Sequence, residues 1–133
     1  MKKKLRICID LDGTICDIRH DPLTYADVKP KAHAAEKISE LRKLGHYIII
    51  NTARNMGSTG HNIGKVMKNV GKTTLEWLDK NGIEYDEIFF GKPNADITID
   101  DRAIRFESWD FISSNLLEES AKENDKHCRS DGW

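Results

Sequence analysis

The chain has 133 residues, of which 38% are hydrophobic and 32% charged, so it has the size of one domain and enough apolar residues for one core. Its 21 Lys and Arg stand against 22 Asp and Glu, and this near balance argues against a general nucleic-acid-binding protein. No apolar run has the ~18–20 residues of a membrane span. Three cysteines without CxxC spacing exclude a disulfide framework and a cysteine zinc cluster.

The N-terminus does not have the pattern of an export signal. Its lysines at positions 2–4 precede only a short apolar run that contains a charge, with no small-residue cleavage site after it. Together with the odd cysteine count, this predicts a protein of the reducing cytoplasm.

Strands and helices alternate along the chain. In order, the patterns predict a buried strand over residues 5–10, a helix from Pro30 to Gly45, a strand over 47–51, a helix from Thr73 or Thr74 to Asn81-Gly82, strands over 87–90 and 97–100, and an amphipathic helix over 109–117. This alternation predicts one α/β, Rossmann-like domain over 1–120, with a mostly parallel sheet, helices on both faces and a polar tail over 121–133. Trp77 and Trp109 are expected in the core, and Cys8 as a small buried hydrophobe.

Two irregular segments, 16–29 and 55–72, follow the first two strands. In open α/β sheets, ligands bind at the carboxyl ends of the strands, which is where both segments begin. Gly71-Lys72-Thr73 resembles the end of a phosphate-binding P-loop, but the first glycine of that pattern is replaced by Val66. We therefore interpret Gly71-Lys72 as a turn before a helix.

Four groups of polar residues follow the predicted strands. Asp10 and Asp12 lie in Asp-Leu-Asp-Gly-Thr after the first strand, and Asn51-Thr52-Ala53-Arg54 ends the second. Lys92 follows the third strand, and Asp100-Asp101 ends the fourth. Because parallel strands end at one edge of a sheet, these side chains are expected to converge there.

This set of motifs resembles the haloacid dehalogenase superfamily of aspartate-nucleophile phosphatases over about residues 5–106. The family pattern is DxDGT, then a strand-end Thr or Ser, a Lys and an acidic pair, all present here in order. Within the superfamily, TARNM, GKP and IDDRA are similar to small phosphatases associated with capsule and surface-polysaccharide biosynthesis. The gaps between Asp12 and Ile50 and between Arg54 and Lys92 have no room for a large cap domain, so a capless member with a small flap at 16–29 is expected.

The resemblance implies a role for each motif. Asp10 would be the nucleophile and a metal ligand, and Asp12 the general acid/base with its backbone carbonyl on the metal. Asp101 would be a direct metal ligand, with Asp100 in support or bound through water. Thr52 would hydrogen-bond a phosphoryl oxygen and Lys92 would neutralise charge. Because a carboxylate and a phosphate repel each other, the expected cofactor is Mg²⁺, which prefers oxygen ligands.

The roles of the other candidates stay open. Arg54 departs from the core motif and either grips a second substrate anion or pairs with an acidic residue. Ala53 and His61 are candidate substrate contacts, and for His61 a surface position is the alternative.

The leading interpretation is a Mg²⁺-dependent phosphomonoesterase that acts through an aspartyl-phosphate on a phosphorylated sugar or saccharide of surface-polysaccharide biosynthesis. The alternative is a nucleotidase or nucleic-acid-end phosphatase, because IDDR also occurs in deoxyribonucleotidases. It is less favoured because Tyr25 is the one aromatic residue in the flap. A catalytically silent regulatory or assembly protein is a third hypothesis. The open cleft is expected to be completed by the two irregular segments or by a second subunit of a homo-oligomer.

Overall fold

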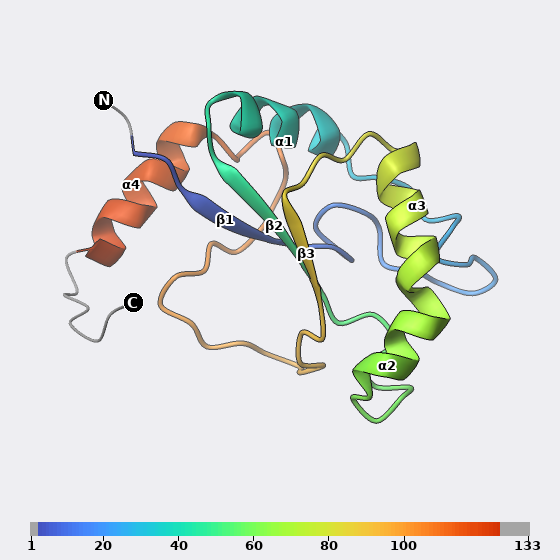
Figure 1. Ribbon diagram of the computed structural model, residues 1–133. Helices are drawn as coiled ribbons and strands as arrows, with labels where there is room; N and C mark the ends of the chain where they lie inside the picture. Colours follow the sequence, from blue (N-terminus) through green and yellow to red (C-terminus); the bar gives the residue numbers. More distant parts are fainter. Residues whose placement is uncertain (1–2, 126–133) are drawn as a thin grey trace.

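A three-stranded parallel sheet in the order β1-β2-β3 forms the centre of the computed structural model, which describes residues 3–125 (Figure 1). β1 spans Arg6–Asp10, β2 spans Tyr47–Thr52 and β3 spans Glu87–Phe90. These strands lie where the β-branched runs predicted them. The α/β class, the parallel sheet and the absence of a cap domain are confirmed.

The two faces of the sheet differ in burial. Ile9 of β1 is paired in register with Ile50 of β2, and both are buried. Cys8 lies one residue away on β1 and therefore points to the opposite face, where Phe89 of β3 is 57% exposed. The expectation that Cys8 is a buried hydrophobe is thus wrong, because strand alternation places it on the less covered face.

Helix α1 begins later than predicted. It spans Ala34–Lys43, and Pro30 is instead paired in an isolated bridge with Cys16. The N–H of Lys31 donates to the carbonyl of Ile15 at 2.8 Å, so this stretch packs as extended chain against the segment that follows β1. The helix ends at Lys43, and Gly45, the predicted stop, follows two residues later with a φ of 95° that favours glycine.

The second helical region is much longer than predicted. α2 spans Ile63–Val66, a π-helical segment η1 spans Met67–Gly71, and α3 spans Lys72–Lys80. The Asn62 side chain caps this run by accepting the N–H of Lys65 at 3.0 Å. Gly71-Lys72 is therefore inside continuous helix, and the interpretation of a turn there is wrong.

The C-terminal third also departs from expectation. Residues 91–113 contain no helix or strand, so the strand predicted over 97–100 is wrong for this structure. α4 spans Ser114–Asp125, later than the predicted 109–117 and extending into the expected tail. Residues 126–133 lie outside the described residues.

The main core lies between the sheet and the helices α1 and α3. Ile38 of α1 and Leu78 of α3 are completely buried together with Ile48 and Ile50 of β2. The two tryptophans are buried as predicted. Trp77 donates its indole N–H to the Val28 carbonyl, and Trp109 donates to the Thr14 carbonyl, each at 2.8 Å.

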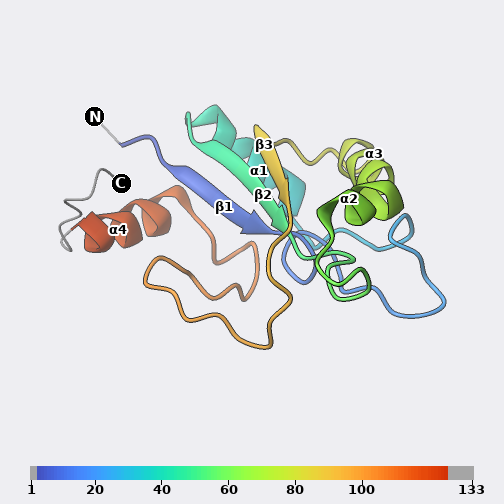
Figure 2. The same ribbon diagram turned by 60° about the horizontal axis from the view of Figure 1, so that its bottom comes forward.

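The three parallel strands have their carboxyl ends at the same edge of the sheet. Figure 2 shows β1 and β2 ending beside the segment that follows β1, in blue, and the green loop that precedes α2. No helix within residues 3–125 combines the length and apolarity needed to cross a membrane.

Candidate active site

The turn after β1 is built around the backbone carbonyl of Leu11. This carbonyl accepts the N–H groups of Thr14, Ile15 and Cys16 at 2.9–3.2 Å, and the Leu11 side chain is completely buried. Gly13 has a φ of 89°, which is in the left-handed region that favours glycine. The turn therefore holds Asp10 and Asp12 at the end of β1 with both carboxylates partly exposed.

Asp10 is paired with Lys92. The Lys92 Nζ lies 3.1 Å from Asp10 Oδ1, and Thr14 Oγ1 donates to Asp10 Oδ2 at 3.4 Å. The backbone N–H groups of Gly91 and Lys92 both donate to the carbonyl of Thr52, at 3.2 and 3.1 Å. These two bonds fix the turn after β3 against the end of β2, which brings the lysine across to β1. About a third of each side chain of the pair is exposed, so a phosphoryl group can reach both.

Asp12 is paired with Arg54, whose side chain has no exposed surface. Arg54 Nε donates to Asp12 Oδ2 at 2.9 Å and Nη2 donates to Oδ1 at 3.0 Å, which is the two-point geometry that arginine forms with carboxylates. Nη1 donates to Thr74 Oγ1 at 3.1 Å, and the guanidinium lies 4.2 Å from the centre of the Tyr25 ring. Of the two roles left open for Arg54, the structure therefore favours pairing with an acidic residue.

Cys16 completes the surroundings of Asp12. Its Sγ lies 3.4 Å from Asp12 Oδ1 and 3.5 Å from Arg54 Nη2. Burial, helped by the negative charge of Asp12, raises the pKa of the Cys16 thiol to about 12. Cys16 is therefore a neutral thiol at ordinary pH and not a nucleophile. No sequence pattern pointed to Cys16 or Thr74, because both reach the site only through the packing of separate elements.

The remaining candidates of β2 and its loop have separate surroundings. Thr52 is 1% exposed, and its Oγ1 accepts the N–H of Arg54 at 3.1 Å. His61 is exposed in the loop before α2, with a φ of 66°. Ala53 lines the cavity described below, and His61 is not among the residues that line it.

The acidic pair is not beside Asp10. Asp100 and Asp101 are exposed in the segment after β3, and Asp101 lines a cavity together with residues 3–7, at the start of β1. Asp10 lies at the opposite end of the same strand. Within the described part of the chain, no group of three or more His, Cys, Asp or Glu is placed to hold a metal ion. A divalent cation with the usual six or more oxygen ligands thus finds only Asp10 and Asp12 here, which is an incomplete set.

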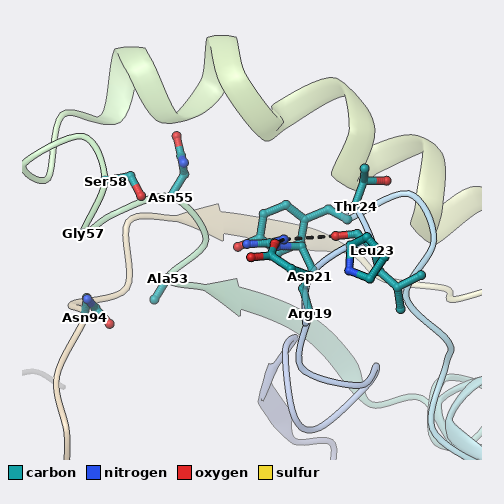
Figure 3. A pocket seen from close by; sticks show the side chains of 11 residues that line it. Arg19, Asp21, Leu23, Thr24, Ala53, Asn55, Gly57, Ser58 and Asn94 are labelled. Carbon is teal, nitrogen blue, oxygen red and sulfur yellow. Dashed lines mark hydrogen bonds and ion pairs between the residues drawn. The ribbon is translucent and has the colours of Figure 1, made fainter.

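A cavity of about 630 Å³ lies between residues of the flap and the loop after β2 (Figure 3). Arg19 in the flap donates to Asp21 at 2.8 Å and to the Leu23 carbonyl at 3.0 Å. The lining is mainly polar and comprises Arg19, Asp21, Pro22, Leu23, Thr24, Tyr25, Ala53, Asn55, Gly57, Ser58 and Asn94. Because Ala53 adjoins Thr52 and Asn94 follows closely after Lys92, the cavity flanks the Asp10 site.

Comparison with known proteins relates the chain to one family. A family model described as haloacid dehalogenase-like hydrolase matches residues 7–87. The crystal structure of a target protein from Vibrio cholerae has 34% identity and a TM-score of 0.78, over 92% of this chain and 99% of that chain. The Pnkp1/Rnl/Hen1 RNA repair complex has a chain with 16% identity and a TM-score of 0.50, over 92% of this chain and 32% of that one, which is a likeness of fold alone. No curated protein sequence matches the chain.

Proposed function

Because the chain belongs to the family of haloacid dehalogenase-like hydrolases, we propose that it is a phosphomonoesterase in which Asp10 attacks phosphorus and forms an aspartyl-phosphate. One observation carries the proposal: the Asp10 carboxylate is partly exposed at a strand end and lies 3.1 Å from the Lys92 ammonium. The Asp10–phosphorus bond forms as the bond to the leaving oxygen breaks. Water then hydrolyses the intermediate and regenerates the carboxylate.

Lys92 has an electrostatic role in this proposal. Its ammonium reduces the repulsion between the Asp10 carboxylate and an incoming phosphate dianion, and it stabilises charge on the equatorial oxygens in the transition state. Thr52 supports this arrangement through its backbone, because its carbonyl holds the N–H of Lys92. We further propose that Thr52 Oγ1, which accepts the N–H of Arg54 and keeps its own proton available, donates a hydrogen bond to a phosphoryl oxygen.

Asp12 is the proposed general acid/base. It gives a proton to the leaving oxygen and takes one from the attacking water, and such proton transfer is typically worth ~10²–10⁴-fold in rate. Arg54 is a positioning residue: its two hydrogen bonds to Asp12 set the direction of the carboxylate, while Thr74 and Tyr25 keep the guanidinium in place.

The proposed cofactor is Mg²⁺, which hydrolases of this family generally use. When bound, a magnesium ion would supply positive charge in addition to that of Lys92 and would further reduce the repulsion between the phosphate and the Asp10 carboxylate. Asp10 and Asp12, the latter through its backbone carbonyl, are the proposed ligands in this part of the chain. They do not form a complete set without the acidic pair.

The proposed substrate is a phosphorylated sugar or saccharide, of the kind used in surface-polysaccharide biosynthesis. The cavity beside Asp10 supports this class, because its amide and hydroxyl groups, from Asn55, Ser58 and Asn94, suit a polyhydroxylated leaving group. Its aromatic residue, Tyr25, already has the Arg54 and Arg19 guanidinium groups over its ring, at 4.2 and 5.4 Å. This arrangement does not favour the stacking of a nucleotide base.

A substrate panel with matched variants tests the proposal. Sugar phosphates, phosphorylated oligosaccharides, nucleotides and an aryl phosphate are compared by phosphate release with Mg²⁺ present. Ser58→Ala and Asn94→Ala are expected to raise KM for the preferred sugar phosphate several-fold and to leave turnover of the aryl phosphate unchanged. Asn115→Ala, an exposed asparagine in α4, is the control that changes neither. Highest kcat/KM on a nucleotide would contradict the substrate class, and no turnover of any phosphoester would contradict the activity.

A further inference from the structure

Residues 97–100 have the sequence of a strand but the surroundings of a loop. Ile-Thr-Ile-Asp is rich in β-branched residues, which fit a pleated and half-buried surface. Nevertheless Ile97 is 75% exposed and Ile99 is 97% exposed. Two exposed isoleucines in an extended segment form a surface that water solvates poorly, so the segment lacks the partner that its sequence requires.

β1 is an edge strand, with no strand paired to one of its two sides in the described residues. It stands at one edge of the sheet and is paired with β2 alone among the strands of residues 3–125. An edge strand presents a row of N–H and C=O groups that can accept one more strand. A strand added there with its carboxyl end beside Asp10 would run parallel to β1.

The chain's own segment cannot supply this strand, because the connection is too short. Only residues 91–96 separate β3 from Ile97, and the first two are tied to the Thr52 carbonyl at the end of β2. From Lys92 onward, the reach to Ile97 is at most roughly 18 Å. In a strand beside β1 that ends with Asp100 next to Asp10, Ile97 would lie about 16 Å from Lys92 along the strand direction and about 10 Å from it across the strands. The straight line between the two residues is then roughly 19 Å long and passes through the sheet itself. Connections between parallel strands generally need about a dozen residues or more.

We propose that two copies of the chain exchange this segment, so that Ile97–Asp100 of each copy adds as a parallel strand to β1 of the other. The exchange carries Asp100 and Asp101 of one copy to Asp10 of its partner copy. The arrangement is two-fold symmetric and closes as a dimer, and a short connection that cannot close within one chain favours such swapping. The chemical use of the delivered carboxylates rests on the proposed phosphatase function; the exchange itself does not.

The incomplete site supports the same conclusion. A single copy holds Asp10 and Asp12 at the end of β1, and its own Asp101 lies near residues 3–7 at the start of that strand. A hard divalent cation needs more oxygen ligands than one copy assembles there. The second copy supplies them without any change in the turn that carries Asp10.

A disulfide tests the exchange without any assay of activity. If the two strands end together, with Asp100 beside Asp10, residue 98 lies opposite the exposed Cys8 of the other copy, within the Cα separation that a disulfide tolerates. In a Cys128→Ser background, Thr98→Cys is expected to give a reducible dimer on mild oxidation. When ¹⁵N-labelled and unlabelled chains are mixed, the disulfide between positions 8 and 98 should join one labelled and one unlabelled peptide. Such a mixed pair shows that the link connects two copies.

Two variants are the controls for this disulfide. Ile99→Cys places the thiol on the opposite face of the strand, and Thr98→Cys with Cys8→Ser removes the acceptor, so both should stay largely uncrosslinked. Equal crosslinking of Ile99→Cys and Thr98→Cys, no crosslink at all, or a linked peptide confined to single copies would overturn the exchange.

Mixed dimers test the use of the delivered carboxylates. Asp10→Asn chains, expected to be inactive at any Mg²⁺ concentration, and Asp101→Asn chains, expected to be inactive at the lowest Mg²⁺ concentration that saturates the wild type, are unfolded together and refolded at equal concentration, and the mixture is assayed at that Mg²⁺ concentration. Half of the dimers are then hybrids with one intact site of two, so activity should return to about a quarter of the wild-type value. An inactive mixture overturns the exchange between copies. If Asp10→Asn chains alone are active, or if Asp101→Asn chains alone are fully active at this Mg²⁺ concentration, the proposed function fails, while the disulfide still decides the exchange.

Discussion

At the scale of single residues, two ion pairs organise the site. Lys92 holds the open carboxylate of Asp10, and the enclosed Arg54 holds Asp12. The difference in exposure assigns different tasks. A cation that a phosphate can reach stabilises the reacting group, whereas a cation sealed behind Tyr25 and Thr74 acts on its carboxylate partner alone.

The role of Arg54 leads to a prediction about leaving groups. Arg54→Met should lower kcat about 10²-fold for an alkyl phosphate, because proton transfer from Asp12 loses its alignment, and should lower it less for nitrophenyl phosphate, which needs no proton. Arg54→Lys should recover only part of the loss, since lysine lacks the two-point geometry. Arg42→Met, which removes a surface arginine paired with Glu84 and Asp86, is the control.

A change in KM, without the loss of kcat, would indicate that Arg54 binds the substrate. A higher KM for the sugar phosphate, with unchanged turnover of both small phosphates, would mean that Arg54 contacts a second anion of the substrate. Unfolding must be measured in parallel, because loss of a buried ion-pair partner typically destabilises a protein by about 3 kcal/mol.

The sequence predicted the positions of site residues best where charged side chains directly follow a predicted strand. Asp10, Asp12 and Lys92 were placed at one edge by strand endings alone, and the structure brings them together. The contacts of Arg54 could not be predicted in the same way. Its partners Asp12, Thr74 and Tyr25 come from three different segments, and only the packed fold decides which of them encloses the guanidinium.

At the scale of elements, the local sequence pattern predicted the three strands, but it missed part of a helix that tertiary packing stabilises. The three observed strands were predicted because each is a short apolar run, rich in isoleucine in β1 and β2 and in phenylalanine in β3, and each contributes residues to the core or packs against it. The helix over Ile63–Lys80 was missed in its first half because Gly64, Asn69 and Gly71 have low helix propensity. Tertiary packing compensates: Val66 and Val70 are buried together with Met56 in a second apolar cluster.

The strand predicted over 97–100 failed for a different reason. Its composition is that of a strand, but a parallel strand also needs a connection that can reach its place in the sheet. Residues 91–96 are too few, and chain connectivity therefore overrides local propensity.

The contact between α4 and the start of β1 leads to a pH prediction. Leu5 N–H donates to His46 Nδ1 at 3.0 Å, so the opposite ring nitrogen carries the proton and donates to Ser114 Oγ at 2.9 Å, which donates to Glu118 at 3.2 Å. Burial lowers the pKa of His46 below its ordinary value. A second proton would also break the bond from Leu5, which would weaken the link that runs through His46 to α4, the helix beside β1 in Figure 1.

The sign of the effect follows from this lowered pKa. Between the folded pKa and the unfolded value near ~6.5, the unfolded chain binds more protons, so stability falls as pH decreases through that range. The free energy of unfolding in urea should therefore drop from pH 7.5 to pH 5.5, and His46→Gln should reduce the drop. His20→Gln, an exposed histidine of the flap, should keep the full pH dependence. An unchanged pH dependence in His46→Gln would contradict the assignment.

At the scale of the whole molecule, one chain positions the proposed nucleophile Asp10, the proposed acid/base Asp12 and a cavity, yet leaves its acidic pair elsewhere. The turn after β3 explains both facts. It is short enough to bring Lys92 directly to Asp10, and for the same reason too short to return the chain to the far edge of β1. Because the chain has no cap domain, we expect the flap and, in the proposed dimer, the second copy to cover the site.

The proposed cofactor leads to a prediction about metal removal. A chelator should abolish turnover and added Mg²⁺ should restore it, because two carboxylates do not bind a phosphate without a cation. Asp101→Asn should raise the Mg²⁺ concentration needed for half-maximal activity more than Asp100→Asn does, since a direct ligand contributes more than one that acts through water. The reverse order would exchange the two roles, and full activity in the chelator would contradict the cofactor.

The central claim is that Asp10 becomes covalently bound to phosphorus, and trapping the intermediate tests it most directly. Enzyme quenched during turnover is reduced with borohydride, which converts an aspartyl-phosphate to homoserine and leaves free aspartate unchanged, and the site is located by peptide mass spectrometry. The expected result is homoserine at position 10 alone, absent without substrate and absent from Asp10→Asn, with Asp79→Asn in α3 behaving like the wild type. Reduction at Asp12 or elsewhere, or continued turnover by Asp10→Asn with no trapped residue, would contradict the claim.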